Sequence, residues 1–280
     1  MKFLVTGAKG QLGGDLCREL ARRGLTGRGV DIDDFDITSE SAVRAYIADY
    51  SPGAVLHCAA YTAVDKAEDD AELCRAINTD GTRYVAGACA AVGAKMLYIS
   101  TDYVFPGQGE KFYETGDRTQ PLNVYGQSKL DGESAMRAET TRCFTVRISW
   151  AFGAQGNNFV KTMLRLGAER EEIGVVADQV GSPTYTADLA PLLCDMALSE
   201  KYGVYHATNE GVCSWYEFAA AVMEEAGLSA KVKPVQTGEY PTRAARPQNS
   251  RLSKESLTQA GFARLPHWRD ALKRYIQAAK

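Results

Sequence analysis

Short apolar runs alternate with helix-like stretches through the first half of the chain, and this alternation constrains the fold most strongly. Each run has strand length, and each intervening stretch is long enough for a crossover helix. The predicted strands are residues 3–5, a short run ending at Val30, and residues 54–58, 96–100 and 144–148. Strands joined in this way form a parallel sheet with helices on both faces. We therefore predict an α/β fold with a Rossmann-type, doubly wound parallel sheet.

The second half has a looser pattern, in which helical stretches are divided by segments that contain glycine and proline. Helices are predicted at about 12–23, 39–50, 66–92, 121–136, 159–167, 188–198, 215–226 and 267–278. We expect residues 1–150, with parts of 185–208, to form a dinucleotide-binding domain. The remaining segments of 151–280 are expected to form a smaller, C-terminal substrate-binding domain.

Composition excludes several classes of partner. The 280 residues carry a net charge of -3, so no strong basic field attracts nucleic acid or an anionic membrane. The seven cysteines are scattered without a Cys-x-x-Cys pair, which is typical of a reducing compartment. With only three histidines, we expect no metal site.

The N-terminal apolar run is too short for a signal peptide, and no stretch reaches the roughly 18 apolar residues of a membrane helix. We therefore expect a cytoplasmic protein.

A glycine-rich turn lies between the first predicted strand and the first predicted helix. Gly7, Gly10 and Gly13 form a Gly-x-x-Gly-x-x-Gly spacing. Glycine permits a tight turn and lets the backbone approach a pyrophosphate, which the N–H groups of the following helix can bind. Asp31 follows at about the ~20-residue separation of a ribose-binding carboxylate, and no Gly-Lys-Ser/Thr of a P-loop is present. The turn therefore predicts a dinucleotide site.

Tyr125 and Lys129 stand four residues apart, so on a helix they share one face. An ordinary tyrosine titrates near pH ~10, and a neighbouring cation lowers that pKa. Thr101 ends the fourth predicted strand, where its hydroxyl can hydrogen-bond a substrate oxygen as charge develops there. We predict that these three residues form the reacting centre of an oxidoreductase that transfers a hydride.

At these residues the sequence resembles the extended short-chain dehydrogenase/reductase superfamily, which combines a glycine turn, a Ser/Thr after the fourth strand and a Tyr-x-x-x-Lys pair. Further segments are similar to those of the dTDP-4-dehydrorhamnose reductase family. They are residues 58–68, 99–105, 121–129, 158–160, 178–184 and 246–250. The resemblance covers nearly the whole chain.

The resemblance implies reduction of the C4 ketone of dTDP-4-dehydro-L-rhamnose, a nucleotide sugar, to dTDP-L-rhamnose with NADPH or NADH. The cofactor-binding residues then expected are Gly7, Gly10, Gln11, Leu12, Gly13, Asp31, Asp36, Ile37, Ala59, Ala60, Tyr61, Tyr125 and Lys129. The substrate-binding residues expected are Thr62, Val64, Thr101, Asp102, Tyr103, Trp150, Asn158 and Arg246. Arg246 is the candidate anchor for the diphosphate, because a guanidinium can bind phosphate oxygens in pairs.

The chain departs from the family pattern in two places. Pro106 stands where the family usually has Asp, which puts the shape of the loop after Thr101 in question. Residues 150–153 read Trp-Ala-Phe-Gly in place of Trp-Val-Tyr-Gly and keep the tryptophan that lines the sugar pocket in relatives.

Three questions stay open at this stage. Dehydratases of the superfamily have Asp-Glu after the threonine, whereas Asp102 is followed by Tyr103. Other epimerases or reductases and a non-catalytic regulatory subunit remain alternatives, although the three catalytic residues argue against the subunit.

Asp31 favours NADH and Lys9, inside the glycine turn, favours NADPH, so we expect dual use. The oligomeric state is undetermined, with a homodimer as one alternative.

Overall fold

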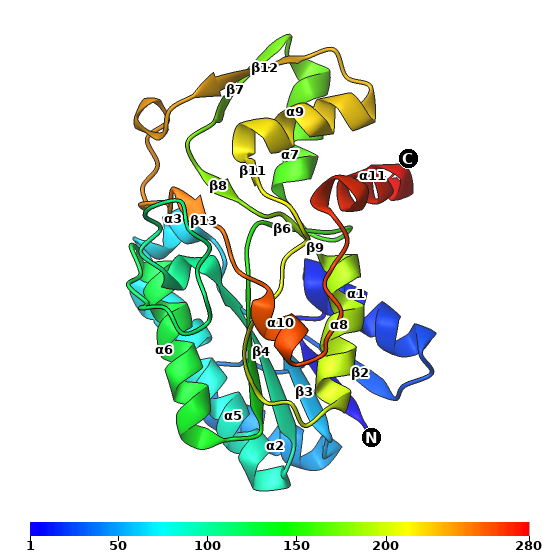
Figure 1. The fold of residues 1–280 in the computed structure, drawn as a ribbon. Helices are drawn as coiled ribbons and strands as arrows, with labels where there is room; N and C mark the ends of the chain where they lie inside the picture. Colours follow the sequence, from blue (N-terminus) through cyan, green and yellow to red (C-terminus); the bar gives the residue numbers. More distant parts are fainter. Residues whose placement is uncertain (280) are drawn as a thin grey trace.

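The computed structural model describes residues 1–279, and its largest element is a parallel six-stranded sheet in the order β10-β5-β4-β3-β1-β2 (Figure 1). The strands are β1 (Phe3–Thr6), β2 (Gly27–Val30), β3 (Ala54–His57), β4 (Lys95–Thr101), β5 (Cys143–Ile148) and β10 (Gly203–His206). The winding direction reverses between β1 and β3. In an open parallel sheet this reversal creates a crevice beyond the carboxyl ends of the strands, where ligands bind.

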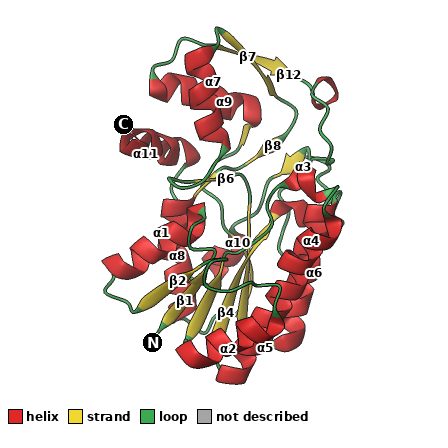
Figure 2. Ribbon diagram, turned by 180° about the vertical axis from the view of Figure 1, so that it is seen from behind, coloured by secondary structure: helices red, strands yellow, loops and turns green. Residues whose placement is uncertain are grey.

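Helices cover both faces of this sheet (Figure 2). Helix α1 (Gln11–Arg22) packs with α8 (Thr186–Leu198) on one face, and α2 (Glu40–Tyr50), α5 (Gly81–Val92) and α6 (Val124–Glu139) cover the other. The leucine stripe of α1 is buried as its spacing predicts, with Leu16 and Leu20 in the same core cluster as Leu193 of α8. The predicted doubly wound sheet is therefore confirmed.

The long helix predicted at 66–92 was wrong as a single element. The structure divides it into α3 (Val64–Ala67), α4 (Ala71–Arg75), the π-helical turn η1 (Ala76–Asp80) and α5. The break after α3 has a physical reason: Glu68 turns toward α6, where its carboxylate accepts a hydrogen bond of 2.9 Å from the Val124 N–H. Short π-helical turns of this kind often occur at functional sites.

The C-terminal half adds a smaller body beyond the carboxyl edge of the sheet. Its strands pair as β6 (Ala151–Phe152) with β9 (Thr184–Tyr185), β7 (Glu172–Val176) with β12 (Lys231–Val235), and β8 (Val180–Gly181) with β11 (Cys213–Ser214) and β13 (Asn249–Ser250). Its helices are α7 (Phe159–Glu169), α9 (Trp215–Ala226) and α11 (Trp268–Ala279), with the 3-10 turn η3 (Thr237–Glu239). Helix α10 (Glu255–Gln259) packs instead against β10 of the large sheet, and a second 3-10 turn, η2 (Asp102–Val104), follows β4.

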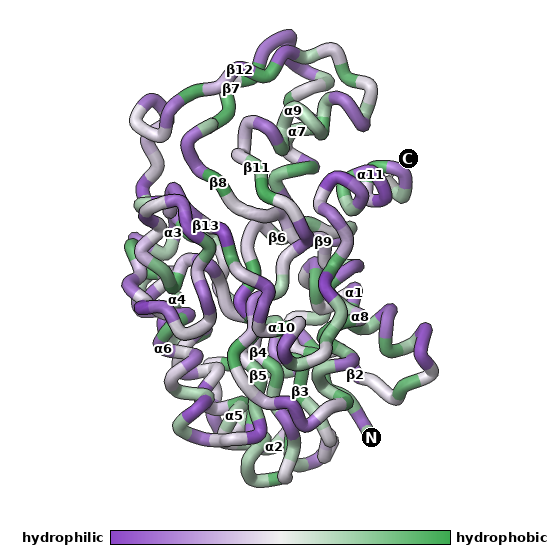
Figure 3. Tube along the Cα trace, in the orientation of Figure 1, coloured by the Kyte–Doolittle hydropathy of each residue, from purple (hydrophilic) through white to green (hydrophobic). Residues whose placement is uncertain are grey.

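The apolar side chains of the two bodies pack in separate clusters, and those of the larger body form one cluster on each face of the sheet. The larger body is centred on the buried strands, and Figure 3 shows green, hydrophobic stretches along them. The smaller body has its own aromatic core, in which Phe152, Phe218 and Trp268 are almost fully buried. Helix α8 and strand β10, both within 185–208, return to the large sheet. It stays a prediction that the larger body binds the dinucleotide and the smaller body binds the substrate.

Helix α6 lies unusually close to β4 because Gly132 faces the strand. A Cβ at Gly132 would stand 2.5 Å from the Tyr98 hydroxyl oxygen and 2.5 Å from the Asn78 carbonyl oxygen. Glycine normally weakens a helix interior, so its presence here is explained by this close approach. The contact sets how near the residues of α6 come to the end of β4. No helix within residues 1–279 has the length and apolar composition needed to span a membrane.

Candidate active site

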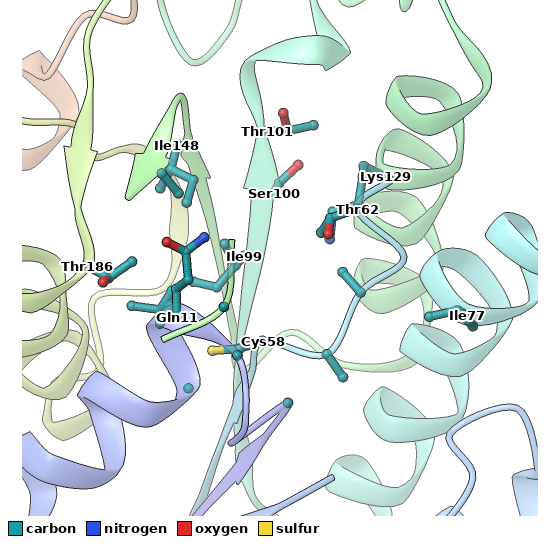
Figure 4. Close-up of a pocket in the computed structure, with 18 of the residues that line it drawn as sticks. Gln11, Cys58, Thr62, Ile77, Ile99, Ser100, Thr101, Lys129, Ile148 and Thr186 are labelled. Carbon is teal, nitrogen blue, oxygen red and sulfur yellow. The ribbon is translucent and has the colours of Figure 1, made fainter. Parts of the chain in front are cut away.

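A cleft of about 840 Å³ opens at the carboxyl ends of the sheet strands, between the two bodies. Most of the predicted site residues line it. They are Gly7, Gly10, Gln11, Leu12, Gly13, Asp31, Ile37, Ala59, Ala60, Thr62, Val64, Thr101, Asp102, Tyr103, Tyr125, Lys129, Trp150 and Arg246. Figure 4 shows Ser100 and Thr101 at the end of β4, with Lys129 on one side of the cleft and Gln11 and Thr186 on the other.

The glycine turn has the geometry of an anion cradle. Gly7 adopts a φ of 67°, which favours glycine, and a Cβ at Gly13 would stand 2.1 Å from the Gly7 carbonyl oxygen. Gly10 caps helix α1 in an extended conformation and no side chain caps its first N–H groups. These N–H groups therefore face the cleft edge, where a pyrophosphate can accept their hydrogen bonds. The turn fits the dinucleotide that the sequence predicts.

Asp31 and Lys9 meet at the rim of this turn. The Asp31 carboxylate accepts hydrogen bonds of 2.9 Å from the N–H groups of Lys9 and Ile32. The Lys9 ammonium forms an ion pair with the exposed carboxylate of Asp33. Asp31 therefore stabilises the turn as well as lining the cleft. Asp33, which sequence reasoning did not consider, partly balances the charge of Lys9.

Thr101, Tyr125 and Lys129 come together from two elements. Thr101 ends β4, and the other two occupy the first turns of α6, where Asn123 caps the helix by accepting a 2.8 Å hydrogen bond from the Gly126 N–H. All three line the cleft, and Thr101 and Lys129 are at most 5% exposed. The structure thus brings the predicted trio into one place.

A buried ion pair fixes the distance between these elements. Glu133 of α6 accepts two 2.8 Å hydrogen bonds from the Arg147 guanidinium of β5 and one of 2.6 Å from the Ser100 hydroxyl of β4. Both charged side chains are nearly inaccessible to solvent. Because a broken buried pair leaves an unpaired charge, this contact strongly favours a single arrangement of the three elements.

Burial dominates the electrostatics of the tyrosine and the lysine. The pKa of Tyr125 is raised above its ordinary value, first by burial and then by the nearby Asp102 carboxylate. Burial lowers the pKa of Lys129 to about 7. Burial thus opposes the predicted lowering of the Tyr125 pKa by Lys129, and that effect of Lys129 stays a prediction. Tyr125 keeps its proton at neutral pH, which is the form that a reduction needs.

Asp102 is tied to a residue far away in the sequence. Its carboxylate accepts hydrogen bonds from the Ser250 hydroxyl and, at 3.1 Å, from the Thr101 hydroxyl. Burial raises the pKa of Asp102 to about 6, and the hydrogen bonds from Ser250 and Thr101 oppose that shift. Asp102 therefore connects the reacting centre to the C-terminal segment that carries Arg246.

Arg246 reaches the cleft from this C-terminal segment. Its guanidinium pairs with the Asp65 carboxylate and donates a 3.2 Å hydrogen bond to the Tyr103 hydroxyl. The Tyr103 ring in turn meets the Tyr125 ring edge-on, with centroids 5.6 Å apart. The arginine is thus oriented before any ligand arrives.

The loop that contains Pro106 is well packed. Phe105, the residue before it, has φ -95° and ψ 161°, the extended conformation that a following proline favours. Gly107 accepts a 2.9 Å hydrogen bond from the Asn249 N–H, and a Cβ at Gly107 would stand 2.4 Å from Pro247. The substitution therefore fits a loop that holds the segment following Arg246.

A pair of stacked tryptophans lines the side of the cleft formed by the smaller body. Trp150 has a left-handed φ of 50°, which is strained for a bulky residue, and its ring stacks on Trp215 at 3.7 Å. Gly181 leaves room for Trp150, since a Cβ there would stand 3.0 Å from the ring. Sequence reasoning missed Trp215 and Thr186. Only the capping box of Ser214 and Glu217 marks the start of α9, and it does not show that Trp215 faces the cleft.

Three predicted site residues do not line the cleft. Asp36 accepts hydrogen bonds of 2.9 and 2.7 Å from the Thr38 N–H and hydroxyl, and Tyr61 donates a 3.0 Å hydrogen bond to Asp70. Asn158 caps α7 by accepting a 2.9 Å hydrogen bond from the Lys161 N–H. Asp36 and Tyr61 are thus held by nearby residues, whereas the Asn158 amide also donates a 3.0 Å hydrogen bond to Oε1 of Gln11, which lines the cleft. Within residues 1–279, no group of three or more His, Cys, Asp or Glu side chains is placed to hold a metal ion.

Comparison with known proteins agrees with this geometry. The family model described as the RmlD substrate binding domain matches residues 1–280. The chain belongs to the dTDP-4-dehydrorhamnose reductase family. The family resemblance inferred from the sequence is therefore confirmed.

Individual relatives match over their full length. The spore coat polysaccharide biosynthesis protein SpsK of Bacillus subtilis is 43% identical over 276 residues, which cover 99% of this chain and 97% of the relative. The dTDP-4-dehydrorhamnose reductase of Escherichia coli is 40% identical over 290 residues, with 99% and 97% covered. The Bacillus anthracis dTDP-4-dehydrorhamnose reductase, solved in complex with NADP, is 44% identical and matches with a TM-score of 0.97 over 99% of both chains.

The buried Asp102 carboxylate predicts how the free energy of unfolding depends on pH. Its pKa is about 6 in the folded chain and near the ordinary 3.8 in the unfolded chain. The folded protein holds this proton more tightly, so this group's contribution to stability decreases as the pH rises from about 4 to about 6. Asp102→Asn removes the buried charge and should raise the free energy of unfolding at pH 7.5 by about 1–3 kcal/mol, with little gain below pH ~4.

Urea unfolding at pH 4 and pH 7.5 measures this difference. Asp49→Asn, at an exposed carboxylate on α2, is the matched control and should change neither value. A loss of stability at pH 7.5, or the same gain at both pH values, would contradict the assignment of a buried charge.

Proposed function

We propose that this protein reduces the C4 ketone of dTDP-4-dehydro-L-rhamnose to give dTDP-L-rhamnose, with NADPH or NADH as the reductant. The observation that carries the proposal is the meeting of Thr101, Tyr125 and Lys129 in the same cleft as the glycine turn and Arg246. The family relation supports the same activity.

The glycine turn and the lysine would hold the dinucleotide. The absence of a Cβ at Gly13 lets the start of α1 pack against the Gly7 carbonyl, and the free N–H groups of α1 can bind the pyrophosphate. Ala59 and Ala60, after β3, line the same part of the cleft. Lys129 can donate hydrogen bonds to the ribose beside the nicotinamide. When bound, the reduced nicotinamide supplies the hydride.

The protein's own residues would manage the proton. Tyr125 retains its proton at neutral pH and can give it to the alkoxide that develops on the sugar. The Thr101 hydroxyl lines the cleft, accepts a hydrogen bond from the Tyr103 N–H and donates its single proton to Asp102. It would hydrogen-bond the same substrate oxygen by turning that proton from Asp102 toward it. Excluding water around this oxygen strengthens both interactions.

Two regions of the cleft would bind the nucleotide sugar. Arg246, already aligned by Asp65 and Tyr103, would bind the diphosphate. Trp150 would pack against the sugar, with Trp215 supporting it from the adjacent helix. The homodimer, one alternative for the oligomeric state, and the cytoplasmic location also stay proposals; the free state of all seven cysteines supports the second.

Tyr125→Phe tests the central assignment. The variant keeps the ring but removes the proton, so kcat should fall by about 10²–10⁴, the usual contribution of general acid catalysis. Cofactor affinity should be nearly unchanged. Oxidation of NADPH in the presence of the keto sugar is the measurement, with Tyr240→Phe, at an exposed position, as control. Near-normal turnover would overturn the role of Tyr125, and an inactive wild-type protein that still binds dTDP-sugar would favour the regulatory alternative.

The preference between NADPH and NADH tests the roles of Asp31 and Lys9 at the rim of the glycine turn. If Asp31 faces the ribose hydroxyls and Lys9 a 2′-phosphate, Asp31→Ala should raise the NADPH/NADH ratio of kcat/KM by about 3- to 30-fold, the effect of one or two hydrogen bonds. Lys9→Ala should lower this ratio. The ratio is the informative quantity because Asp31 also holds the turn at Lys9. An unchanged ratio in Asp31→Ala would place that carboxylate away from the ribose.

A further inference from the structure

We propose that Tyr98 is a positioning residue that holds the Lys129 ammonium toward the cofactor side of the cleft through a cation–π contact. The Lys129 nitrogen lies 4.0 Å from the centre of the Tyr98 ring, well within the range of such contacts. Lys129 lines the cleft and Tyr98 does not, so the ring lies behind the ammonium. The proposal rests on the proposed function in one respect, namely that the Lys129 ammonium binds the ribose of the cofactor in the cleft.

The ring is fixed from several sides. Tyr98 is fully buried in β4, and its hydroxyl lies 3.4 Å from the carbonyl oxygens of Asn78 and Lys129. Its ring stacks on His57, with centroids 5.7 Å apart and an interplanar angle of 21°. Gly132 gives it room, because any side chain there would collide with the Tyr98 hydroxyl. A rigid ring can hold a lysine head group in one position.

His57 is held by hydrogen bonds rather than by charge. Its Nδ1 lies 2.7 Å from the Thr6 hydroxyl, and its Nε2 lies 3.2 Å from the Thr82 hydroxyl. Burial lowers the pKa of His57 to about 3, so it is neutral at physiological pH and adds no positive charge beside Lys129. The aromatic platform therefore remains intact across the working pH range.

No carboxylate within residues 1–279 makes an ion pair with Lys129, and Glu133 acts on it only at a distance. The oxygens of Glu133 are bound to Arg147 and Ser100, and Arg147 balances its charge. The other titratable groups that face Lys129 are Cys58, Cys74, His57, Tyr98 and Tyr125. All of these are neutral near pH 7, because burial raises the pKa of each thiol and each phenol among them.

These surroundings explain why a ring is needed. Burial lowers the pKa of Lys129 to about 7, so the ammonium is close to losing its proton under physiological conditions. An aromatic face stabilises a cation without accepting its N–H hydrogens into strong hydrogen bonds. The Tyr98 ring thus favours the charged form and leaves the N–H groups free for ribose hydroxyls.

Fluorinated rings test the contact without changing core volume. Tyr98→Phe keeps the aromatic face, and phenylalanine analogues with one, two and three ring fluorines at position 98 weaken its negative potential stepwise. The pKa of Lys129 is measured in cofactor-free protein by NMR of lysine labelled at Cε, with Lys129→Met to assign the signal. Tyr98→Phe should titrate close to wild type, near 7, and the fluorine series should lower the pKa progressively by roughly 0.3–1.5 pH units in total.

A pKa that does not depend on fluorination, in proteins that remain folded by circular dichroism, overturns the proposal. Tyr98→Leu gives a second, larger change and should also lower the Lys129 pKa, whereas Phe144→Leu, a comparable deletion in the same core sheet, should leave it unchanged. A raised pKa in Tyr98→Leu would mean that water solvates the ammonium better than the ring does and would also overturn the proposal.

The same variants separate this inference from the proposed function. The affinity for NADPH, measured by calorimetry at pH 6 and pH 8, should fall more steeply with pH as fluorines are added. A fluorine-dependent pKa with an NADPH affinity that does not follow it would uphold the role of Tyr98 and remove Lys129 from cofactor binding. An unchanged pKa would reject Tyr98 and leave the Tyr125 and keto-sugar experiments as independent tests.

Discussion

The buried contact between Glu133 and Arg147 determines where every reacting group in the cleft stands. Glu133 belongs to α6, which carries Tyr125 and Lys129; Arg147 belongs to β5, which leads to Trp150. The same carboxylate binds Ser100, the residue before Thr101. One ion pair therefore joins the three elements that present the proton donor, the oxygen-binding hydroxyl and the tryptophan wall. Because removing one partner of such a pair typically costs about 3–5 kcal/mol, alternative spacings of these elements are strongly disfavoured.

Local patterns in the sequence predicted much of the fold and the cofactor side of the site. The glycine turn, the leucine stripe of α1 and the Tyr–Lys spacing are contained in short segments, so their geometry follows from backbone conformation and helix periodicity. The parallel, doubly wound sheet followed from the alternation of strands and helices, whereas the strand order and the sixth strand, β10, did not. The helix predicted at 66–92 is interrupted at residues 68–70, where Glu68 binds a distant backbone N–H that no local pattern reveals, and is continuous over 71–92.

The substrate side of the site depends on contacts between distant segments. Ser250 reaches Asp102, Arg246 reaches Asp65 and Tyr103, and Trp215 stacks on Trp150. Family motifs pointed to Asp102, Tyr103, Trp150 and Arg246, but not to the partners that hold them. Asp36, Tyr61 and Asn158 showed the opposite difficulty, since a residue expected in the site can instead serve a turn, a nearby side chain or a helix cap at the edge of the cleft. Burial was the other quantity hidden from the sequence, and it opposes the lowering of the Tyr125 pKa that was expected from Lys129.

The central claim is that a hydride passes to C4 of a keto sugar in this cleft. NADPH deuterated at both C4 positions of the dihydronicotinamide, incubated with the protein and dTDP-4-dehydro-L-rhamnose, tests it most directly. Proton NMR and mass spectrometry of the sugar product report where the label goes. The account predicts one deuterium at C4 of dTDP-L-rhamnose for each NADPH oxidised. Deuterium at another carbon, or unlabelled product formed without NADPH oxidation, would contradict it.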